Sequence, residues 1–174
     1  PTSKVIDDKT FGEIVEIARS KGVKVLSDEV YSDISFVKAK SILDFGDDNI
    51  LVSGFSKSFL MTGWRIGYVV AEKELVNKII KLNQITTTCV PAFIQYGALK
   101  GLESRKEIAD DIRNQFKLRA EAAYSVLSKS PMKFSKPDAP FYLFPKVDGL
   151  DSERFALDLL DHGVAVAPGT AFGD

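Results

Sequence analysis

One stretch of the sequence, from Ser53 to Gly67, holds residue types that could carry out covalent chemistry. Lys57 lies in this stretch between an apolar run and the cluster Phe59 to Met61. Burial disfavours the charged form of an ammonium group, and the neutral amine is the form that makes a Schiff base with an aldehyde. Lys57 is therefore a candidate nucleophile. The alternative is an ordinary lysine whose aliphatic stem lies on an apolar surface while its ammonium stays in water.

Two further candidates follow a short apolar run at residues 23–26, which predicts a strand. Asp28 and Tyr31 come directly after it. In open parallel α/β sheets the ligand crevice lies outside the carboxyl ends of the strands, so both side chains fall where a site is expected. Taken singly, each also has a purely structural explanation, because Asp28 could be a turn or capping aspartate and Tyr31 a half-buried packing residue.

The elements that would position these residues alternate between helices and buried strands. Asp7 and Asp8 are N-cap candidates for a helix that ends near Gly22, and its apolar positions recur at helical spacing. Two more strands are expected at 50–53 and 66–71, and a helix at 72–86 whose inward face comprises Leu75, Val76, Ile79, Ile80 and Leu82. This alternation predicts an α/β fold with a mostly parallel sheet.

The pattern changes in the C-terminal part of the chain. Helices are expected at 92–102 and, with a longer apolar stripe, at 105–127. Strands at 133–135 and 141–145, a helix at 152–161 and a strand at 164–166 then follow. We therefore divide the chain into a larger α/β unit, residues 1–104, and a smaller, incomplete α+β unit, residues 105–174.

The composition is that of an ordinary soluble globular protein and excludes several partners. Of 174 residues 45% are hydrophobic, and the net charge of -1 argues against nucleic acid as a partner. The single cysteine, Cys89, excludes an intrachain disulfide and, with one histidine, argues against a metal site, so a reducing, cytoplasmic compartment is expected. No apolar run approaches the roughly 20 residues of a membrane span. The chain lacks an initiator Met, and we expect both ends to be cuts in a longer protein.

Considered together, the candidate side chains match the groups of one cofactor. A neutral lysine forms an imine with an aldehyde, an arginine such as Arg65 binds a phosphate, an aspartate pairs with a protonated ring nitrogen, and a tyrosine hydroxyl bonds a phenolate oxygen. Pyridoxal 5′-phosphate (PLP) has all four partner groups, and a lysine with an aspartate partner for the ring nitrogen is common in PLP enzymes.

The stretch Gly54 to Gly67, GFSKSFLMTGWRIG, closely resembles the PLP-attachment signature of class I/II aminotransferases, the fold type I family that includes aspartate aminotransferase. The run SDEVY at 27–31 resembles the second cofactor motif of that family, and Pro1-Thr2 resembles part of its Asn-Pro-Thr-Gly loop. Residues 141–145 and 166–173 resemble elements of its small domain. The resemblance therefore extends over the whole chain.

This resemblance implies a role for each candidate. Lys57 would form the internal aldimine and then carry the proton between the substrate Cα and C4′ of the cofactor. Asp28 would pair with the pyridine nitrogen and Tyr31 with the phenolic oxygen. Arg65 and the hydroxyl of Ser56 would hold the phosphate, with Ser53 competing for the role of Ser56. The implied substrates are an amino acid and a 2-oxo acid, and the parent protein would be a homodimer.

The chain departs from the family pattern in ways that predict an incomplete site. Ser3 stands where the family has a glycine, and Pro140 replaces another. The glycine-rich phosphate loop, the aromatic residue that stacks on the ring and the arginine that binds the substrate carboxylate do not occur in this sequence. Two alternatives stay open: a PLP-dependent lyase or synthase of the same fold, and a catalytically silent fragment or interaction module.

Overall fold

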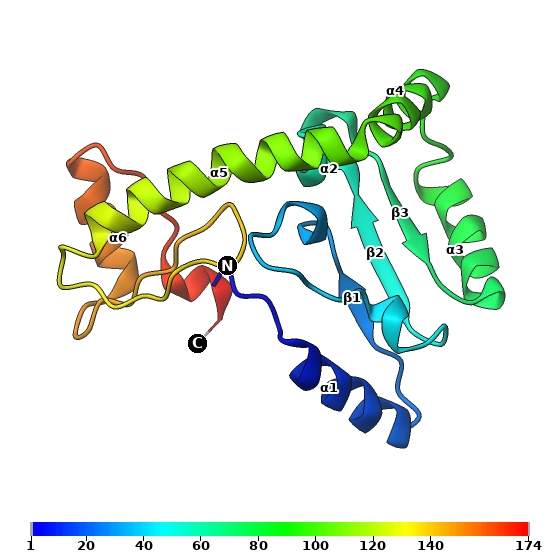
Figure 1. Cartoon of the computed structure of the whole chain (residues 1–174), viewed down its shortest axis with the longest axis horizontal. Coiled ribbons are helices and arrows are strands. Elements are labelled where there is room, and N and C mark those ends of the chain that lie inside the picture. The colour runs from blue at the N-terminus through cyan, green and yellow to red at the C-terminus, as the bar shows by residue number, and fades with distance from the viewer. Residues whose placement is uncertain (1, 174) are drawn as a thin grey trace.

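The computed structural model describes residues 2–173, and a three-stranded sheet lies at the centre of the larger unit (Figure 1). Its strands are β1 (Leu26–Asp28), β2 (Ile50–Gly54) and β3 (Gly67–Val70), in the order β1-β2-β3. β1 and β2 are parallel, whereas β3 is antiparallel to β2. The carboxyl ends of β1 and β2 therefore lie at the same edge of the sheet as the start of β3.

β1 begins three residues later than the apolar run at 23–26 predicted. Leu26 is the first residue that pairs with β2, opposite Ile50. The amide of Val25 instead donates to a side-chain oxygen, Oδ1 of Asn49, at 3.4 Å. Residues 23–25 of the apolar run therefore precede the β ladder, which extends from Leu26 to Asp28.

The long helices agree closely with the helical periodicity of the sequence. The first, α1 (Asp8–Ser20), begins at the N-cap Asp7, whose carboxylate accepts hydrogen bonds from the amides of Lys9 and Thr10. An acceptor at this position satisfies amides that have no partner inside the helix. The others are α3 (Lys73–Thr86), α4 (Ala92–Glu103), α5 (Arg105–Leu127) and α6 (Ser152–Asp161), and the last two have the predicted bounds.

Shorter helical segments complete the chain. They are the α-helix α2 (Phe55–Ser58) and the 3-10 helices η1 (Ser32–Ile34), η2 (Ile42–Phe45), η3 (Thr62–Trp64) and η4 (Gly169–Phe172). Among the described residues, the helices formed by the chain lack the combination of length and hydropathy that a membrane crossing requires.

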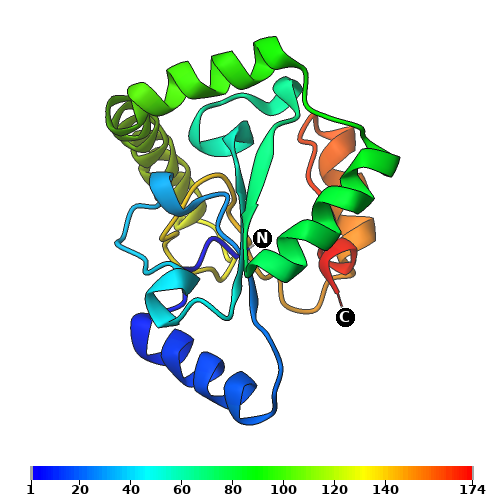
Figure 2. The same cartoon turned by 90° about the vertical axis from the view of Figure 1, so that its right-hand side faces the viewer.

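α1 packs against the sheet through a small core. Val15, Ile42 and Leu51 are buried together, with Phe11 and Phe45 packed at their margin. Seen along the sheet in Figure 2, α1 and α3 lie on different sides of the strands. α1 thereby covers one side of β2, which carries Leu51.

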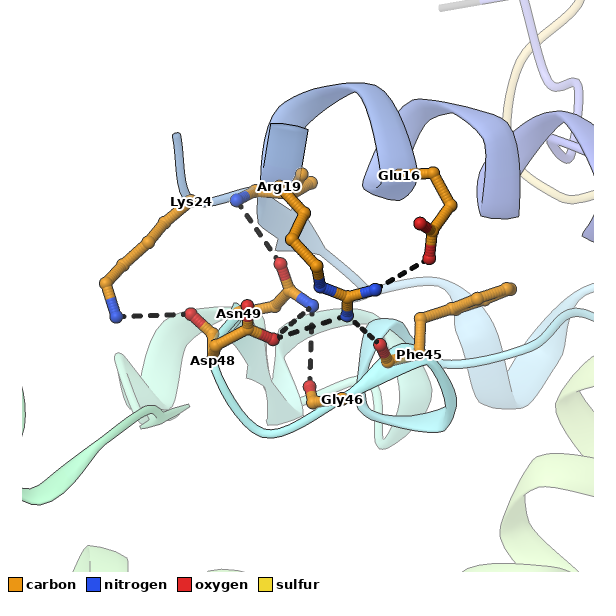
Figure 3. A network of polar contacts seen from close by, with 8 residues as sticks. Glu16, Arg19, Lys24, Phe45, Gly46, Asp48 and Asn49 are labelled. Atoms are coloured by element: carbon orange, nitrogen blue, oxygen red, sulfur yellow. Dashed lines mark hydrogen bonds and ion pairs between the residues drawn. The ribbon is translucent and has the colours of Figure 1, made fainter. Parts of the chain in front are cut away.

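A polar network fixes the end of α1 to the loop before β2 (Figure 3). The guanidinium of Arg19 donates to Oε1 of Glu16 at 2.6 Å and to the carbonyl of Phe45 at 2.9 Å. Asn49, only 3% exposed, bonds the carbonyl of Gly46. These bonds hold the loop that leads into β2 and so help set the register of the strand.

α5 connects the two units. Near its start, Ala109 and Ile112 are buried with Ile34 of η1, and Tyr31, Phe116 and Phe141 pack around this cluster. The helix then runs away from the sheet toward α6 (Figure 1). α5 is thus the element that brings the last third of the chain next to the residues after β1.

The prediction of strands in the smaller unit is wrong, as far as the described residues 2–173 show. Only an isolated bridge between Lys133 and Lys146 forms there, and residues 141–145 and 164–166 form no ladder in that described range. The backbone just before residues 141–145 bonds loops instead of a strand. The amide of Asp138 donates to the carbonyl of Ser3 at 2.8 Å, and the amide of Phe36 donates to the carbonyl of Asp138 at 2.8 Å.

The inward face predicted for α3 is only partly covered. Leu75, Val76 and Ile79 are half-buried, whereas Ile80 and Leu82 are exposed. All residues of β3 are exposed as well. The helical periodicity identified the apolar stripe correctly, but within residues 2–173 no element covers the whole of it.

Candidate active site

Three of the predicted site residues lie at one edge of the sheet because of the strand directions. Asp28 ends β1, and Lys57 is in α2, just after the end of β2. Arg65 lies just before β3, which runs the opposite way, so it reaches the same edge. The sheet therefore places residues from three strand ends at the same edge.

Two glycines allow β2 and β3 to approach closely beneath Lys57. Gly54 and Gly67 face each other in the antiparallel pair. A Cβ atom on Gly67 would lie 2.8 Å from the carbonyl oxygen of Ser53, and one on Gly54 would lie 3.1 Å from the carbonyl of Ile66. Because these neighbours are backbone atoms, a side chain at either position would force the strands apart.

The lysine is half-buried and faces an aromatic ring. Nζ of Lys57 lies 5.7 Å from the centroid of the Phe141 ring, a distance at which an ammonium is attracted by the ring face. The short helix that carries it is anchored by the hydroxyl of Ser58, which donates to the carbonyl of Val30 at 3.1 Å. The Lys57 side chain is thus directed toward the segment after α5 and not into open solvent.

Tyr31 contacts the same phenylalanine. Its ring centroid lies 5.8 Å from that of Phe141 in an edge-on arrangement. Burial raises the pKa of Tyr31 above its ordinary value, and hydrogen bonding with Tyr142 and the charge of Asp28 act in the same direction. The Tyr31 hydroxyl therefore keeps its proton.

Asp28 is exposed at the strand end. Its Oδ1 accepts a hydrogen bond from the amide of Val30 at 3.1 Å, which orients the carboxylate. Within residues 2–173 no side chain or amide bonds the other oxygen, Oδ2. Asp28, Tyr31 and Tyr142 line one cavity of about 470 Å³, which Ser3 and Pro140 also border.

The two residues predicted to hold a phosphate, Arg65 and Ser56, are less closely connected to the other candidate site residues. Arg65 is exposed and has a left-handed backbone (φ 52°, ψ 50°), and its Nη1 donates to the carbonyl of Thr62 at 2.8 Å. Ser56 is half-buried. The competing Ser53 donates its hydroxyl to the carbonyl of Glu29 at 3.4 Å, which leaves Ser56 the freer of the two. Neither Arg65, Ser56 nor Lys57 lines the cavity beside Asp28.

Packing against α4 holds the stretch that carries Lys57 and Arg65. Gly97 and Gly101 lie one helical turn apart, and Cβ atoms on them would lie 2.5 Å from the Trp64 ring and 3.1 Å from the Phe59 ring. The two aromatic side chains on either side of the turn thus rest on a glycine face of α4, which fixes the turn against the helix.

Reasoning from the residues gave no chemical role to Phe141 and Tyr142, although both contact candidate site residues. Phe141 touches Lys57 and Tyr31, and Tyr142 lies beside Tyr31. Their distance along the chain hides these contacts from any local pattern. The only signal was the apolar, aromatic-rich run at 141–145 itself.

A second cavity lies away from these residues. It has a volume of about 770 Å³ and is bordered by residues 32, 33 and 35–39 and by the junction of α4 and α5. Several of its charged side chains already have partners: Arg105 binds Asp33, and Arg113 binds Asp110. We therefore place the site by its donor groups and not by cavity size. Among residues 2–173, no three His, Cys, Asp or Glu side chains converge as metal ligands.

The donor groups at this edge fit PLP. A carboxylate with a free oxygen suits a protonated ring nitrogen, a protonated phenol suits an anionic ring oxygen, and an amine in partly apolar surroundings suits an aldehyde. Tyr31 and Lys57 supply two of these groups at the ring of Phe141, and Asp28 supplies the carboxylate at the end of β1, beside Tyr31. The phosphate would require the guanidinium of Arg65, which is exposed and bonded locally.

Comparison with known proteins gives the family. The family described as aminotransferase class I and II matches residues 1–173. The chain therefore belongs to this family. It is 40% identical over 182 residues to a probable aspartate aminotransferase of Methanocaldococcus jannaschii, an alignment that covers 100% of this chain and 48% of that protein.

Solved structures agree with this family and with the predicted fold class. The aspartate aminotransferase of Thermotoga maritima matches with a TM-score of 0.91 at 35% identity, over 100% of this chain and 47% of that one. An aromatic aminotransferase from Pyrococcus horikoshii matches with a TM-score of 0.92 at 34% identity, over 100% and 49%. The α/β, fold type I class is thus confirmed, and the chain spans about half the length of the relatives it matches.

Proposed function

We propose that this chain supplies the lysine-bearing part of the active site of a PLP-dependent aminotransferase, which moves an amino group between an amino acid and a 2-oxo acid. The observation that carries the proposal is the convergence of Asp28, Tyr31 and Lys57 at one edge of the sheet, with Lys57 and Tyr31 against the same ring. Membership of the aminotransferase class I and II family supports it.

Each residue would have a distinct task. Bound PLP supplies an aldehyde for the lysine and a ring that accepts electrons from the substrate Cα. Asp28 would keep the ring nitrogen protonated, and Tyr31 would donate a hydrogen bond to the ring oxygen. Lys57 would take a proton at Nζ and return it, because an amine held next to the reacting carbon is a general base and then a general acid. Arg65 and Ser56 would hold the phosphate.

The finer organisation belongs to the same proposal. Residues 1–104 would form part of the PLP-binding large domain and residues 105–174 part of the small domain, divided where α5 begins. The whole protein would be a homodimer. A cytoplasmic location is proposed because the single cysteine, Cys89, suits a reducing compartment.

Covalent trapping tests the proposal directly. The chain is mixed with PLP, reduced with borohydride and digested, and the labelled peptide is identified by mass spectrometry. We expect the label on Lys57. Lys57→Ala should abolish it, whereas Lys78→Ala, which removes an exposed lysine of α3, should not. Label spread over several lysines in proportion to their exposure would contradict the assignment and favour a catalytically silent chain.

A second measurement separates transfer from elimination. A protein that includes this chain and is as long as the matched relatives is given an amino donor and a 2-oxo acid. The products are then measured. Appearance of a new amino acid with one new 2-oxo acid supports the aminotransferase. Release of ammonia without a new amino acid would support a lyase of the same fold.

A further inference from the structure

The residue after the candidate lysine is a buried polar side chain that the proposed function does not use. Ser58 ends α2 and is only 4% exposed. A buried hydroxyl needs a hydrogen-bond partner, because burying it without one costs free energy. Its partner lies 28 positions earlier in the chain, where the carbonyl oxygen of Val30 accepts from the Ser58 hydroxyl at 3.1 Å. The bond therefore joins the helix of Lys57 to the segment that follows β1.

Val30 is the link between two of the candidate site residues. Its amide donates to Oδ1 of Asp28 at 3.1 Å, and its carbonyl belongs to the peptide group that leads into Tyr31. The Asp28 carboxylate thus restrains the backbone of Val30 at the amide, and the Ser58 hydroxyl restrains it at the carbonyl. Both polar groups of this one residue are bonded, and one of the two bonds comes from the neighbour of Lys57.

The backbone ladder between β1 and β2 stops just before this point. The last backbone bond runs from the amide of Glu29 to the carbonyl of Val52 at 2.8 Å. The Ser53 hydroxyl then lies 3.4 Å from the carbonyl of Glu29, which is close to the limit for a hydroxyl donor. The bond from Ser58 is shorter, at 3.1 Å, and its donor is buried. Ser58 therefore supplies the firmer connection beyond the end of the ladder.

The apolar contacts of α2 serve a different purpose. Phe55 is buried with Met61 and with Ala98 of α4. Apolar packing is non-directional, so it holds the helix against α4 without defining where Lys57 stands relative to the segment after β1. A hydrogen bond requires a particular distance and angle, and the bond of Ser58 can therefore define that position.

We propose that Ser58 is a positioning residue for the candidate site: its hydroxyl holds the helix of Lys57 in a fixed place relative to Asp28 and Tyr31, through the main chain of Val30. This inference rests on the proposed function, in which the three side chains act on one cofactor ring. Ser58 acts through the residues on either side of its hydrogen bond and takes no part in the reaction itself.

The first test needs no cofactor. Hydrogen exchange of the Val30 amide is followed by NMR in the wild-type chain and in Ser58→Ala. We expect Val30 to exchange roughly 2–10 times faster in Ser58→Ala, the change that loss of one neutral hydrogen bond gives. Ser130→Ala is the matched control, because it removes a partly buried hydroxyl that donates to the carbonyl of Leu127, three residues earlier. It should leave the exchange of Val30 unchanged.

The second test measures the reactivity of the lysine. PLP is added to each chain, the product is reduced with borohydride after increasing times, and the label on Lys57 is quantified. We expect Ser58→Ala to label roughly tenfold more slowly, because a misplacement of about 1 Å can cost a hundredfold in a positioned reaction. Ser130→Ala should label at the wild-type rate.

A double-variant cycle separates positioning from a general loss of structure. Asp28→Asn keeps an oxygen that accepts from the amide of Val30 but removes the carboxylate. If Ser58 acts by aligning Lys57 with Asp28, the slowing caused by Ser58→Ala should shrink to less than about twofold in the Asp28→Asn chain. Effects that multiply in the double variant, or an unchanged Val30 exchange in Ser58→Ala, would overturn the inference. A wild-type label that does not fall on Lys57 would instead refute the proposed function, and the Val30 exchange would still decide whether Ser58 holds the segment.

Discussion

Replacing Gly67 by alanine tests how strictly the sheet positions the candidate site. The added Cβ would lie 2.8 Å from the carbonyl oxygen of Ser53, whereas ordinary contacts begin near 3.4 Å. The strands must therefore separate by about 0.6 Å, because neither backbone can rotate out of the way. The strand that faces Gly67 is β2, and it leads directly into the helix of Lys57.

The expected cost follows from two opposing effects. Overpacking of this kind costs typically about 1–3 kcal/mol, while replacing glycine inside a strand recovers roughly 0.5–1 kcal/mol of backbone entropy. We expect Gly67→Ala to lower the free energy of unfolding by about 1–2 kcal/mol. A misplacement of about 1 Å can cost a hundredfold in a positioned reaction, so PLP labelling of Lys57 should slow by roughly tenfold.

Gly63 offers a matched control in the same stretch of sequence. A Cβ on Gly63 would meet no atom within 4 Å, and neither Gly63 nor Gly67 has a positive φ. Urea unfolding and borohydride-trapped labelling are measured for both alanine variants. If Gly67→Ala unfolds within about 0.5 kcal/mol of Gly63→Ala and labels at the same rate, the close approach of the strands does not position the lysine.

Three further outcomes follow from the packing and the charges. Gly97→Ala should lower the thermal midpoint, because its Cβ would lie 2.5 Å from the Trp64 ring and an overpacking cost of about 1–3 kcal/mol exceeds the helical gain of about 1 kcal/mol. Ile42→Ala should cost about 2–5 kcal/mol in urea unfolding because Ile42 is fully buried, whereas Ile85→Ala, at an 84% exposed position, should change little. Since the pKa of Tyr31 is raised above its ordinary 10.0, the unfolded chain ionises first; stability should hold below pH 10.0 and fall as the pH rises above it, less steeply in Tyr31→Phe.

Local patterns predicted the helices because their information is local. The apolar stripe of α5 and the cap at Asp7 involve neighbours within one or two turns. The run at 141–145 also had a strand-like pattern, but a strand needs a partner, and its neighbour Asp138 bonds the loops at Ser3 and Phe36 instead. A sequence pattern states a preference, and distant pairing decides whether it is realised.

The candidate site could be predicted from the sequence only as far as the ends of the strands could be predicted. Asp28 and Lys57 follow apolar runs, so their common edge could be inferred before any coordinates, although their cofactor roles stay predictions. Phe141 and Tyr142 could not be found this way, because α5 carries the chain away from the sheet before they return to it. Their contacts depend on the packing of α5 on η1, which no short pattern encodes.

The bonds between the two ends of the described chain have a consequence for the order of folding during synthesis. The bond from Ser3 to Tyr142 spans 139 positions, and that from Lys4 to Lys136 spans 132. At about 5–20 residues per second, Tyr142 is made roughly 7–28 s after Ser3. The strands β1, β2 and β3 are complete well before that moment, so the sheet can form while the cavity is still open on one side. The nascent chain therefore passes through a stage in which Asp28 and Tyr31 have been synthesised but the wall formed by Tyr142 has not.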